Sequence, residues 1–137
     1  MSETIVPAVP FRSADVIRQY HAHVYYDPQS SRDRAARLRE HVAVLFPQAI
    51  LGRWHDALVG PHSQSMYQIA FPNALFASLL PWLMLNRDGL TILLHPETGD
   101  AYADHTDHTD HAVWLGSILP LRLDALKNAE AASPPPV

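Results

Sequence analysis

The order of strand-like and helix-like segments is the feature that most constrains how this sequence can fold. Residues 18–26 are rich in aromatic and β-branched side chains with a period of two, which predicts a strand. A helix pattern follows, with Ser30 or Ser31 as its expected N-cap and Pro47 at its end. Residues 50–59 then predict a second strand. The first half of the chain is therefore expected to be a strand–helix–strand unit.

The second half of the chain predicts a further strand, helix and strand. A turn signal at residues 60–63 precedes a strand pattern at residues 65–71. Asn73 is the expected cap of the second helix, and Gly89 is its expected C-terminal stop. Residues 90–95 predict the fourth strand. The order β-α-β-β-α-β is that of the ferredoxin-like α+β sandwich, an antiparallel sheet with two helices on one face.

The chain has room for one domain. It has 137 residues, of which 47% are hydrophobic and 18% charged, as in a compact globule rather than a disordered chain. We place this domain at residues 12–126, between an N-terminal arm at residues 1–11 and a disordered Pro-rich tail at residues 127–137. Within it, a His/Asp-rich loop at residues 104–111 is expected to lead into a short edge strand.

Charge and cysteine content exclude several classes of function. The net charge of −4 provides no basic stripe for phosphates, so we expect no nucleic-acid partner. The absence of cysteine excludes disulfides, thiolate metal sites and cysteine nucleophiles. The N-terminus has no signal-peptide pattern, and the longest apolar stretch, residues 74–85, is too short to cross a bilayer. We therefore expect a soluble cytoplasmic protein without a membrane partner.

Nine histidines stand out in a chain with only ten Lys and Arg residues. We expect the first and third strands to be parallel neighbours, with the second and fourth strands running against them. One end of the sheet would then collect the start of the first strand, the turn before the third and the end of the fourth. These segments carry His21, His23, His62 and His95. Because histidine is the commonest metal ligand and a proton carrier near neutral pH, this edge is the candidate site.

Strand alternation predicts a polar lining on the helix-free face of the sheet. His21, His23 and Tyr25 share one face of the first strand, and Arg53 and Gln68 can join them from the second and third strands. Met and Leu side chains are interleaved with these groups, so we expect a lined pocket rather than a solvated surface. A second copy of the same sheet often closes such a face, which predicts a homodimer.

Two histidines at positions i and i+2 of a strand can form a neutral nitrogen triad with a histidine from a neighbouring segment. Such a triad suits iron, zinc, copper or nickel. A carboxylate from Glu97, Asp100 or Asp104 could complete a set of two histidines and one carboxylate. The alternative interpretation is that His21 and His23 only form hydrogen bonds on a half-buried face. Spacing alone leaves both interpretations open.

Four of the other histidines are not expected to be ligands of the site. We expect His41 at the surface of the first helix and His55 in the pocket wall or the core. We expect His108 and His111 in a mobile loop, where they would bind metal only adventitiously. Motifs for phosphate, dinucleotide, serine-hydrolase or zincin chemistry are absent from the sequence.

Five ordered motifs carry a resemblance to a known family. They are YHAHVYYD at residues 20–27, GPHSQSMYQIAF at 60–71, PWLMLNR at 81–87, LLHPETGD at 93–100 and DHTDHAVWLG at 107–116. Together they closely resemble the DOPA 4,5-dioxygenase family of the fungal type, which has many small bacterial members. The resemblance implies a ferredoxin-like, often dimeric fold, and extradiol cleavage of a catechol ring with non-haem iron(II) and dioxygen.

The resemblance also implies roles for individual residues. The motif histidines of the family match His21, His23, His62 and His95, of which His21, His62 and His95 are the expected metal ligands. His23 is expected as a fourth ligand or as an acid–base catalyst. The loop is longer than the usual DHTDH of the family by one HTD unit, which leaves the register of His105, His108 and His111 open; we take His105 as the second catalytic histidine.

The expected substrate is L-DOPA or a related ortho-diphenol. Arg53, Tyr25 and Gln68 are the expected substrate-binding residues, with Arg53 holding an acidic side chain of the catechol. Zinc or nickel could replace iron(II) in a purified sample. Two alternatives remain: a non-catalytic dimeric module that binds metal or a small aromatic ligand, and a metal-dependent hydrolase or isomerase that uses a zinc-bound water.

Overall fold

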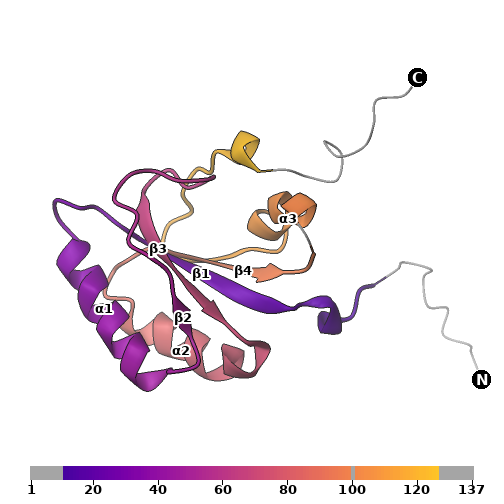
Figure 1. Cartoon of the computed structure of the whole chain (residues 1–137), viewed down its shortest axis with the longest axis horizontal. Coiled ribbons are helices and arrows are strands. Elements are labelled where there is room, and N and C mark those ends of the chain that lie inside the picture. The colour runs from indigo at the N-terminus through magenta and orange to yellow at the C-terminus, as the bar shows by residue number, and fades with distance from the viewer. Residues whose placement is uncertain (1–10, 100, 127–137) are drawn as a thin grey trace, which may run out of the picture.

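A five-stranded antiparallel sheet forms the centre of the protein (Figure 1). The computed structural model describes residues 11–99 and 101–126. The strand order is β2-β3-β1-β4-β5. The strands are β1 (Gln19–Tyr26), β2 (Ile50–Leu51), β3 (Ser65–Phe71), β4 (Ile92–Glu97) and β5 (Val113–Leu115). The predicted tail, and all of the predicted arm except Phe11, lie outside the described residues.

Two helices, α1 (Arg32–Leu45) and α2 (Phe76–Asn86), cover one face of this sheet (Figure 1). Ser31 precedes α1, as predicted, whereas a 3-10 turn at Asn73–Leu75 precedes α2. The main core lies between helices and sheet, because alternate residues of β1 point toward the helices. Its buried members include Ala22, Val24 and Tyr26 from β1, Ala35, Leu38 and Val42 from α1, and Leu79 and Leu83 from α2. The predicted α+β class is confirmed.

The direction of the third strand corrects one expectation. β1 pairs with β3 in an antiparallel register that joins Tyr20 to Phe71 and Tyr26 to Ser65. The first and third strands are therefore not parallel neighbours. The physical reason is that α1 carries the chain back so that β1 and β2 run in the same direction, and β3 lies between them and runs against both.

The second strand is much shorter than the predicted range of residues 50–59. After Leu51 the Gly52 amide still donates to the Gln68 carbonyl at 2.7 Å, but the next bridge joins His55 to Met66. From Gly52 to His55 the chain after β2 advances by three residues, while β3 advances by only two, from Met66 to Gln68. This mismatch breaks the regular ladder as a bulge does. Trp54 lies in this break, with its ring 5.0 Å from that of Tyr67.

The fourth strand and the segment after it also differ from expectation. β4 continues through Pro96 to Glu97. Proline is tolerated at this position because the main-chain groups of Glu97 face β1, whereas those of Pro96 face away from it. On that other side β5 pairs only with residues 92–94, so no hydrogen bond is lost at Pro96. Residues Asp104–His108 form a short helix, α3, instead of a mobile loop. The predicted edge strand that follows is confirmed as β5.

The helix-free face of the sheet is covered by the chain itself. Tyr25, Met66 and Leu93 form a second core there, and packed against it are Val59, Ala112, Trp114, Leu119 and Leu121. In Figure 1, α3 lies across the sheet from α1 and α2. This face does not require a second copy to bury it, so the homodimer stays a prediction.

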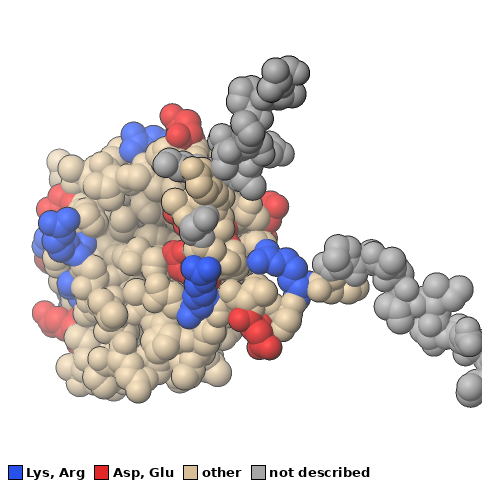
Figure 2. All heavy atoms as spheres, turned by 45° about the vertical axis from the view of Figure 1, so that its right-hand side comes forward, with Lys and Arg blue, Asp and Glu red and all other residues tan. Residues whose placement is uncertain are grey.

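The surface of the described residues carries no concentrated basic region in the view of Figure 2, where Lys and Arg are interspersed with Asp and Glu over a largely uncharged surface. Among the described residues, no helix combines the length and the apolar character that crossing a bilayer requires.

Candidate metal centre

Five imidazole rings gather on the helix-free face of the sheet. β1 provides His21 and His23, because strand alternation points both toward this face. β4 provides His95, which lies directly opposite His21 in the ladder. His62 comes from the connection between β2 and β3, and His108 comes from α3. All four histidines predicted as ligands therefore lie in one cluster.

The cluster lies on the face of the sheet, not at one end as expected. The beginning of β3 pairs with the end of β1, so the turn that carries His62 is at the opposite end from His21. His62 reaches the cluster because the 52–64 connection folds back over the sheet face. Its hydrogen-bonding partner there is the Tyr25 hydroxyl, 2.7 Å from His62 Nδ1.

The C-terminal part of the domain holds this connection in position. His62 forms an isolated bridge with Leu121. The amide of Arg122 donates to the Pro61 carbonyl at 2.7 Å, and its guanidinium donates to the Gly60 carbonyl at 3.0 Å. Segments about 60 residues apart in sequence therefore place one imidazole.

A buried carboxylate positions α3. Asp107 is fully buried and accepts hydrogen bonds from the amide of Thr98 at 2.9 Å and from its hydroxyl at 2.8 Å. His111 Nδ1 lies 2.8 Å from the same carboxylate. Because Thr98 directly follows β4, these bonds fix α3 at the end of that strand and bring His108 over His95, with ring centroids 3.9 Å apart.

The five rings divide into two overlapping groups with the spacing of metal ligands. One group is His21, His23 and His95, and the other is His23, His62 and His108. Within each group the candidate nitrogen atoms lie within 4.8 Å of one another. The Nε2 atoms of His23 and His95 are only 3.0 Å apart. His23 is the residue common to both groups.

Oxygen atoms hold the Nδ1 side of four of the rings. His21 Nδ1 lies 2.8 Å from a Glu97 carboxylate oxygen, and His62 Nδ1 lies 2.7 Å from the Tyr25 hydroxyl oxygen. His95 Nδ1 donates to the Pro96 carbonyl at 3.0 Å, and His108 Nδ1 donates to the Asp104 carbonyl at 2.7 Å. This pattern orients the rings, as is usual for histidine ligands. The Nε2 atoms have no oxygen partner among the described residues; those of His21 and His95 lie 3.3 Å from the Gln19 amide and 3.0 Å from His23 Nε2.

His23 has a buried nitrogen without a partner. Since His95 donates through Nδ1, its Nε2 atom carries a lone pair and accepts a hydrogen bond. The proton between the rings of His23 and His95 is therefore on His23 Nε2. The Nδ1 atom of His23 is then also a lone pair, and it has no hydrogen-bond partner in the part of the chain that the structure describes. A buried polar atom left unsatisfied is costly, and a cation is a natural partner for such a set of neutral nitrogens.

Burial lowers the pKa values of four of the five rings. Burial, reinforced by the neighbouring imidazoles, holds the pKa of His23 well below its ordinary value. For the same reasons the pKa of His62 falls to about 3 and that of His95 to about 4. Burial also lowers the pKa of His108. Because metal ligands must be deprotonated, these four rings are ready to bind a cation at neutral pH.

A hollow of about 280 Å³ opens beside the cluster. It is lined by His21, His23, His62 and His108, together with Val59, Gly60, Pro61, Met66, Gln68, Glu97, Asp104 and Leu126. His95 is not among the lining residues. The hollow therefore gives a small molecule access to four of the five imidazoles.

The residues predicted to bind substrate have different positions. Gln68 lines the hollow, as expected. Tyr25 lies beneath it, buried, with its hydroxyl on His62. Arg53 is exposed and does not line the hollow. His105 does not line it either, and its carbonyl accepts a hydrogen bond from Thr109. Of the three candidate carboxylates, Glu97 and Asp104 line the hollow, and Asp100 lies outside the described residues.

His108 is the site residue that sequence reasoning missed. The loop contains two overlapping DHTDH copies, at residues 104–108 and 107–111, and the first copy ends in the cluster. Its histidine reaches the site because Asp104 and His108 are one helical turn apart, so the carbonyl of one holds the ring of the other. That spacing was the available signal.

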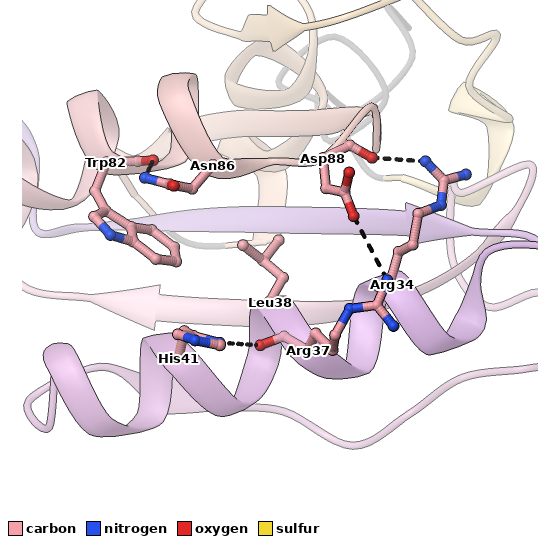
Figure 3. Close-up of a pocket in the computed structure, with 7 residues that line it drawn as sticks. All are labelled: Arg34, Arg37, Leu38, His41, Trp82, Asn86 and Asp88. Carbon is pink, nitrogen blue, oxygen red and sulfur yellow. Dashed lines mark hydrogen bonds and ion pairs between the residues drawn. The ribbon is translucent and has the colours of Figure 1, made fainter.

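A second hollow lies on the opposite face of the sheet, between α1 and α2 (Figure 3). Its two arginines are already engaged, since Arg34 donates to the Asp88 carbonyl and Arg37 lies 3.8 Å from the Asp88 carboxylate. His41 folds onto the Arg37 carbonyl, and the exposed position predicted for it is confirmed. These contacts join the two helices and contribute nothing to the histidine cluster.

Comparison with known proteins identifies a family. A sequence model described as the Dopa 4,5-dioxygenase family matches residues 20–125. A DOPA 4,5-dioxygenase of Amanita muscaria is 32% identical over 114 residues, which cover 78% of this chain and 49% of that protein. An uncharacterized 21.2 kDa protein of Botryotinia fuckeliana is 31% identical over 116 residues, covering 80% of this chain and 63% of that protein. The chain thus spans about half to five-eighths of the length of these relatives.

A solved structure shares the fold. The crystal structure of "a putative dioxygenase" from Nostoc punctiforme superposes with a TM-score of 0.79 at 47% sequence identity. The match covers 84% of this chain and 96% of that chain.

Proposed function

Because this chain belongs to the Dopa 4,5-dioxygenase family, we propose that it is a non-haem iron(II) extradiol dioxygenase that cleaves a catechol ring. The observation that carries the proposal is the set of largely buried imidazoles whose nitrogen atoms lie, in two groups, within 4.8 Å of one another beside a hollow. A histidine set of this kind suits iron(II), and the hollow has room for a small aromatic molecule with one end at the rings.

We assign the ion to His23, His62 and His108. All three are buried, all three line the hollow, and their nitrogen atoms form one of the two ligand groups. A reactive metal site needs positions open to substrate, and this group faces the hollow whereas His95 does not. When bound, iron(II) supplies Lewis acidity toward the catechol oxygens and electron transfer to dioxygen.

His21 is the proposed proton acceptor. Its side chain is 17% exposed at the wall of the hollow, and Glu97 accepts the hydrogen on its Nδ1 atom. This pairing fixes the ring and leaves Nε2 to take the proton of a catechol hydroxyl. In the structure the Gln19 amide lies 3.3 Å from Nε2, so it must move aside when substrate binds.

The other residues of the hollow bind and orient the ring. Val59, Pro61, Met66 and Leu126 provide apolar walls that contact an aromatic ring and exclude water. Gln68 provides an amide that can hydrogen-bond a hydroxyl of the substrate. Tyr25 acts through His62, whose orientation its hydroxyl fixes.

Oxygen uptake tests this function. Protein purified without nickel resin is reconstituted anaerobically with iron(II) and then mixed with dioxygen and a panel of catechols that includes L-DOPA. We expect one oxygen consumed per catechol and a yellow ring-opened product that absorbs in the visible range. Metal bound without oxygen uptake for any catechol contradicts the proposal and favours a non-catalytic binding module.

A variant separates the two proposed roles. We expect His21→Gln to keep the metal content of the parent protein but to lower kcat by about 10²–10⁴-fold, the usual contribution of a general base. If His21→Gln loses its metal instead, the ion belongs to the group formed by His21, His23 and His95.

A further inference from the structure

The charged side chains that line the hollow beside the histidine cluster are all acidic. Apart from the histidines, the ionisable side chains that line it are Glu97 and Asp104. Lys and Arg are absent from the lining among the described residues. A catechol that binds with its hydroxyls at the imidazoles must therefore place its remaining substituent against walls that are apolar, anionic or, at Gln68, neutral and polar.

The two carboxylates differ in what they already contact. Glu97 is paired with His21 at 2.8 Å. Within the described part of the chain, the Asp104 carboxylate has neither a hydrogen bond nor an ion pair, although its backbone carbonyl holds His108. Asp104 is half-buried at the start of α3, so its charge is only partly solvated. It is the negative group of the hollow that remains available to a ligand.

The cations of this region are engaged elsewhere. Arg122 is exposed and donates to the Gly60 carbonyl, and Arg18 is exposed and donates to the Gly99 carbonyl. Arg53, predicted from the sequence to bind an acidic substituent, is exposed and outside the lining. An anionic substituent would meet Asp104 without a compensating charge in the lining.

We infer that this site selects catechols whose side chain carries a cationic amine, with Asp104 as the residue that binds the ammonium group. The inference rests on the proposed dioxygenase function. A carboxylate and an ammonium at contact distance attract each other more strongly where water is partly excluded than in bulk water. A carboxylate of the substrate at the same place would be repelled by Asp104 to a similar extent. A carboxylate on the substrate is not needed for binding, and a catechol with only a carboxylate is disfavoured.

The test compares three catechols of similar size that differ in charge. Iron(II)-reconstituted protein is assayed with 3,4-dihydroxyphenethylamine, 4-ethylcatechol and 3,4-dihydroxyphenylacetate. We expect kcat/KM to fall in that order, with at least about a tenfold difference between the amine and the acid. Equal values for the amine and the acid, or a preference for the acid, overturn the inference.

A charge-neutral variant assigns the preference to Asp104. We expect Asp104→Asn to reduce the amine-to-acid ratio of kcat/KM by about tenfold, a larger change than in kcat/KM for 4-ethylcatechol. The matched control is Asp110→Asn, which removes an exposed carboxylate of the second DHTDH copy that does not line the hollow. An equal loss for all three catechols in Asp104→Asn, or an equal shift of the ratio in Asp110→Asn, contradicts the assignment.

Binding of unreactive analogues keeps the inference separate from the dioxygenase proposal. Tyramine and 4-hydroxyphenylacetate have one ring hydroxyl, so their affinities for the iron(II)-loaded protein can be measured by calorimetry under anaerobic conditions. Tighter binding of tyramine, weakened in Asp104→Asn, supports the charge preference even if no catechol is cleaved. Tighter binding of 4-hydroxyphenylacetate overturns it even if catechols are cleaved.

Discussion

His105 and His108 occupy equivalent positions in the sequence pattern yet have different surroundings. Both follow an aspartate in the repeated loop, but only His108 is part of a ligand group. His108 is buried with its ring 3.9 Å from that of His95, and His105 lies away from the hollow. The helical turn from Asp104 to His108 makes this difference, because it directs one ring inward and the other aside.

Metal affinity should distinguish these two histidines. We expect His108→Ala to bind iron(II) or zinc(II) at least about 10–100-fold more weakly than the parent protein. This range is typical of losing a residue that only orients a metal ligand, so it is a lower limit for losing a ligand itself. We expect His105→Ala to stay within about twofold of the parent. Competition with a chromophoric chelator measures both affinities. Equal losses in the two variants would place the ion outside the assigned group.

The Tyr25 hydroxyl is expected to act on the metal through His62. Its removal in Tyr25→Phe leaves His62 Nδ1 buried without its partner at 2.7 Å. We expect a loss of about 1–3 kcal/mol in the free energy of unfolding and roughly 10-fold weaker metal binding. Urea denaturation of the metal-free protein and chelator competition measure the two effects.

A matched tyrosine separates orientation of the ligand from general stability. Tyr67→Phe removes a buried hydroxyl that donates to the Ala35 carbonyl at 2.8 Å on the helix side of the sheet. We expect a similar loss of stability from this variant but no change in metal affinity. If both variants weaken metal binding alike, Tyr25 has no specific role in orienting His62.

Among the elements, α3 depends most on a single side chain. It has five residues, too few to be stable alone, and Asp107 attaches it to Thr98 and His111. We expect Asp107→Ala to lower the free energy of unfolding by about 2–3 kcal/mol, because it leaves partly buried donors of Thr98 and His111 unpaired. Metal affinity should fall as well, because His108 loses its support.

Asp110→Ala is the control for this element. Asp110 is exposed two residues beyond α3, so we expect its removal to change stability by less than about 0.5 kcal/mol and metal affinity not at all. Chemical denaturation and chelator competition are again the measurements. A stability loss without a loss of affinity in Asp107→Ala would mean that α3 does not position a ligand.

The elements that could be predicted are those whose local pattern agrees with their packing. β1, α1 and β3 lie within one or two residues of their predicted limits, because alternation and the signals at Ser31 and Pro47 match the structure. The 50–59 segment has the same strand-like pattern, but Trp54 is drawn between Tyr26 and Tyr67, and Arg32 lies over its ring. Tertiary packing therefore overrides a local preference at this edge.

The site was predictable from residue types and faces, whereas its geometry depended on strand direction. His21 and His23 share a face by alternation alone, and His95 follows by the same rule. The expected meeting of the histidines at one end of the sheet was wrong, because β3 runs against β1. His62 still reaches the cluster, through long-range contacts of the 52–64 connection with Tyr25 and Leu121 that no local pattern encodes.

For the whole molecule, the buried histidines make stability depend on pH. In the unfolded chain a histidine takes up a proton at a pKa of about 6.5, whereas the pKa values of His62 and His95 in the fold are about 3 and about 4. The unfolded state therefore binds more protons below pH 6.5, and the free energy of unfolding falls as the pH drops from about 6.5 toward 4. Each such histidine contributes about 1.4 kcal/mol per pH unit in this window.

Urea denaturation of the metal-free protein at pH 7.0, 6.0 and 5.0 measures this loss. The difference in slope between the parent protein and a variant isolates the contribution of the replaced histidine. We expect the free energy of unfolding of His62→Asn to depend less steeply on pH than that of the parent protein, by about the contribution of one histidine. The reason is that the variant lacks a buried group that takes up a proton only on unfolding. His41→Asn, which replaces an exposed histidine outside the cluster, is the matched control. A stability that is constant from pH 7 to 5 would mean that the cluster accepts protons in the folded state, contrary to its burial.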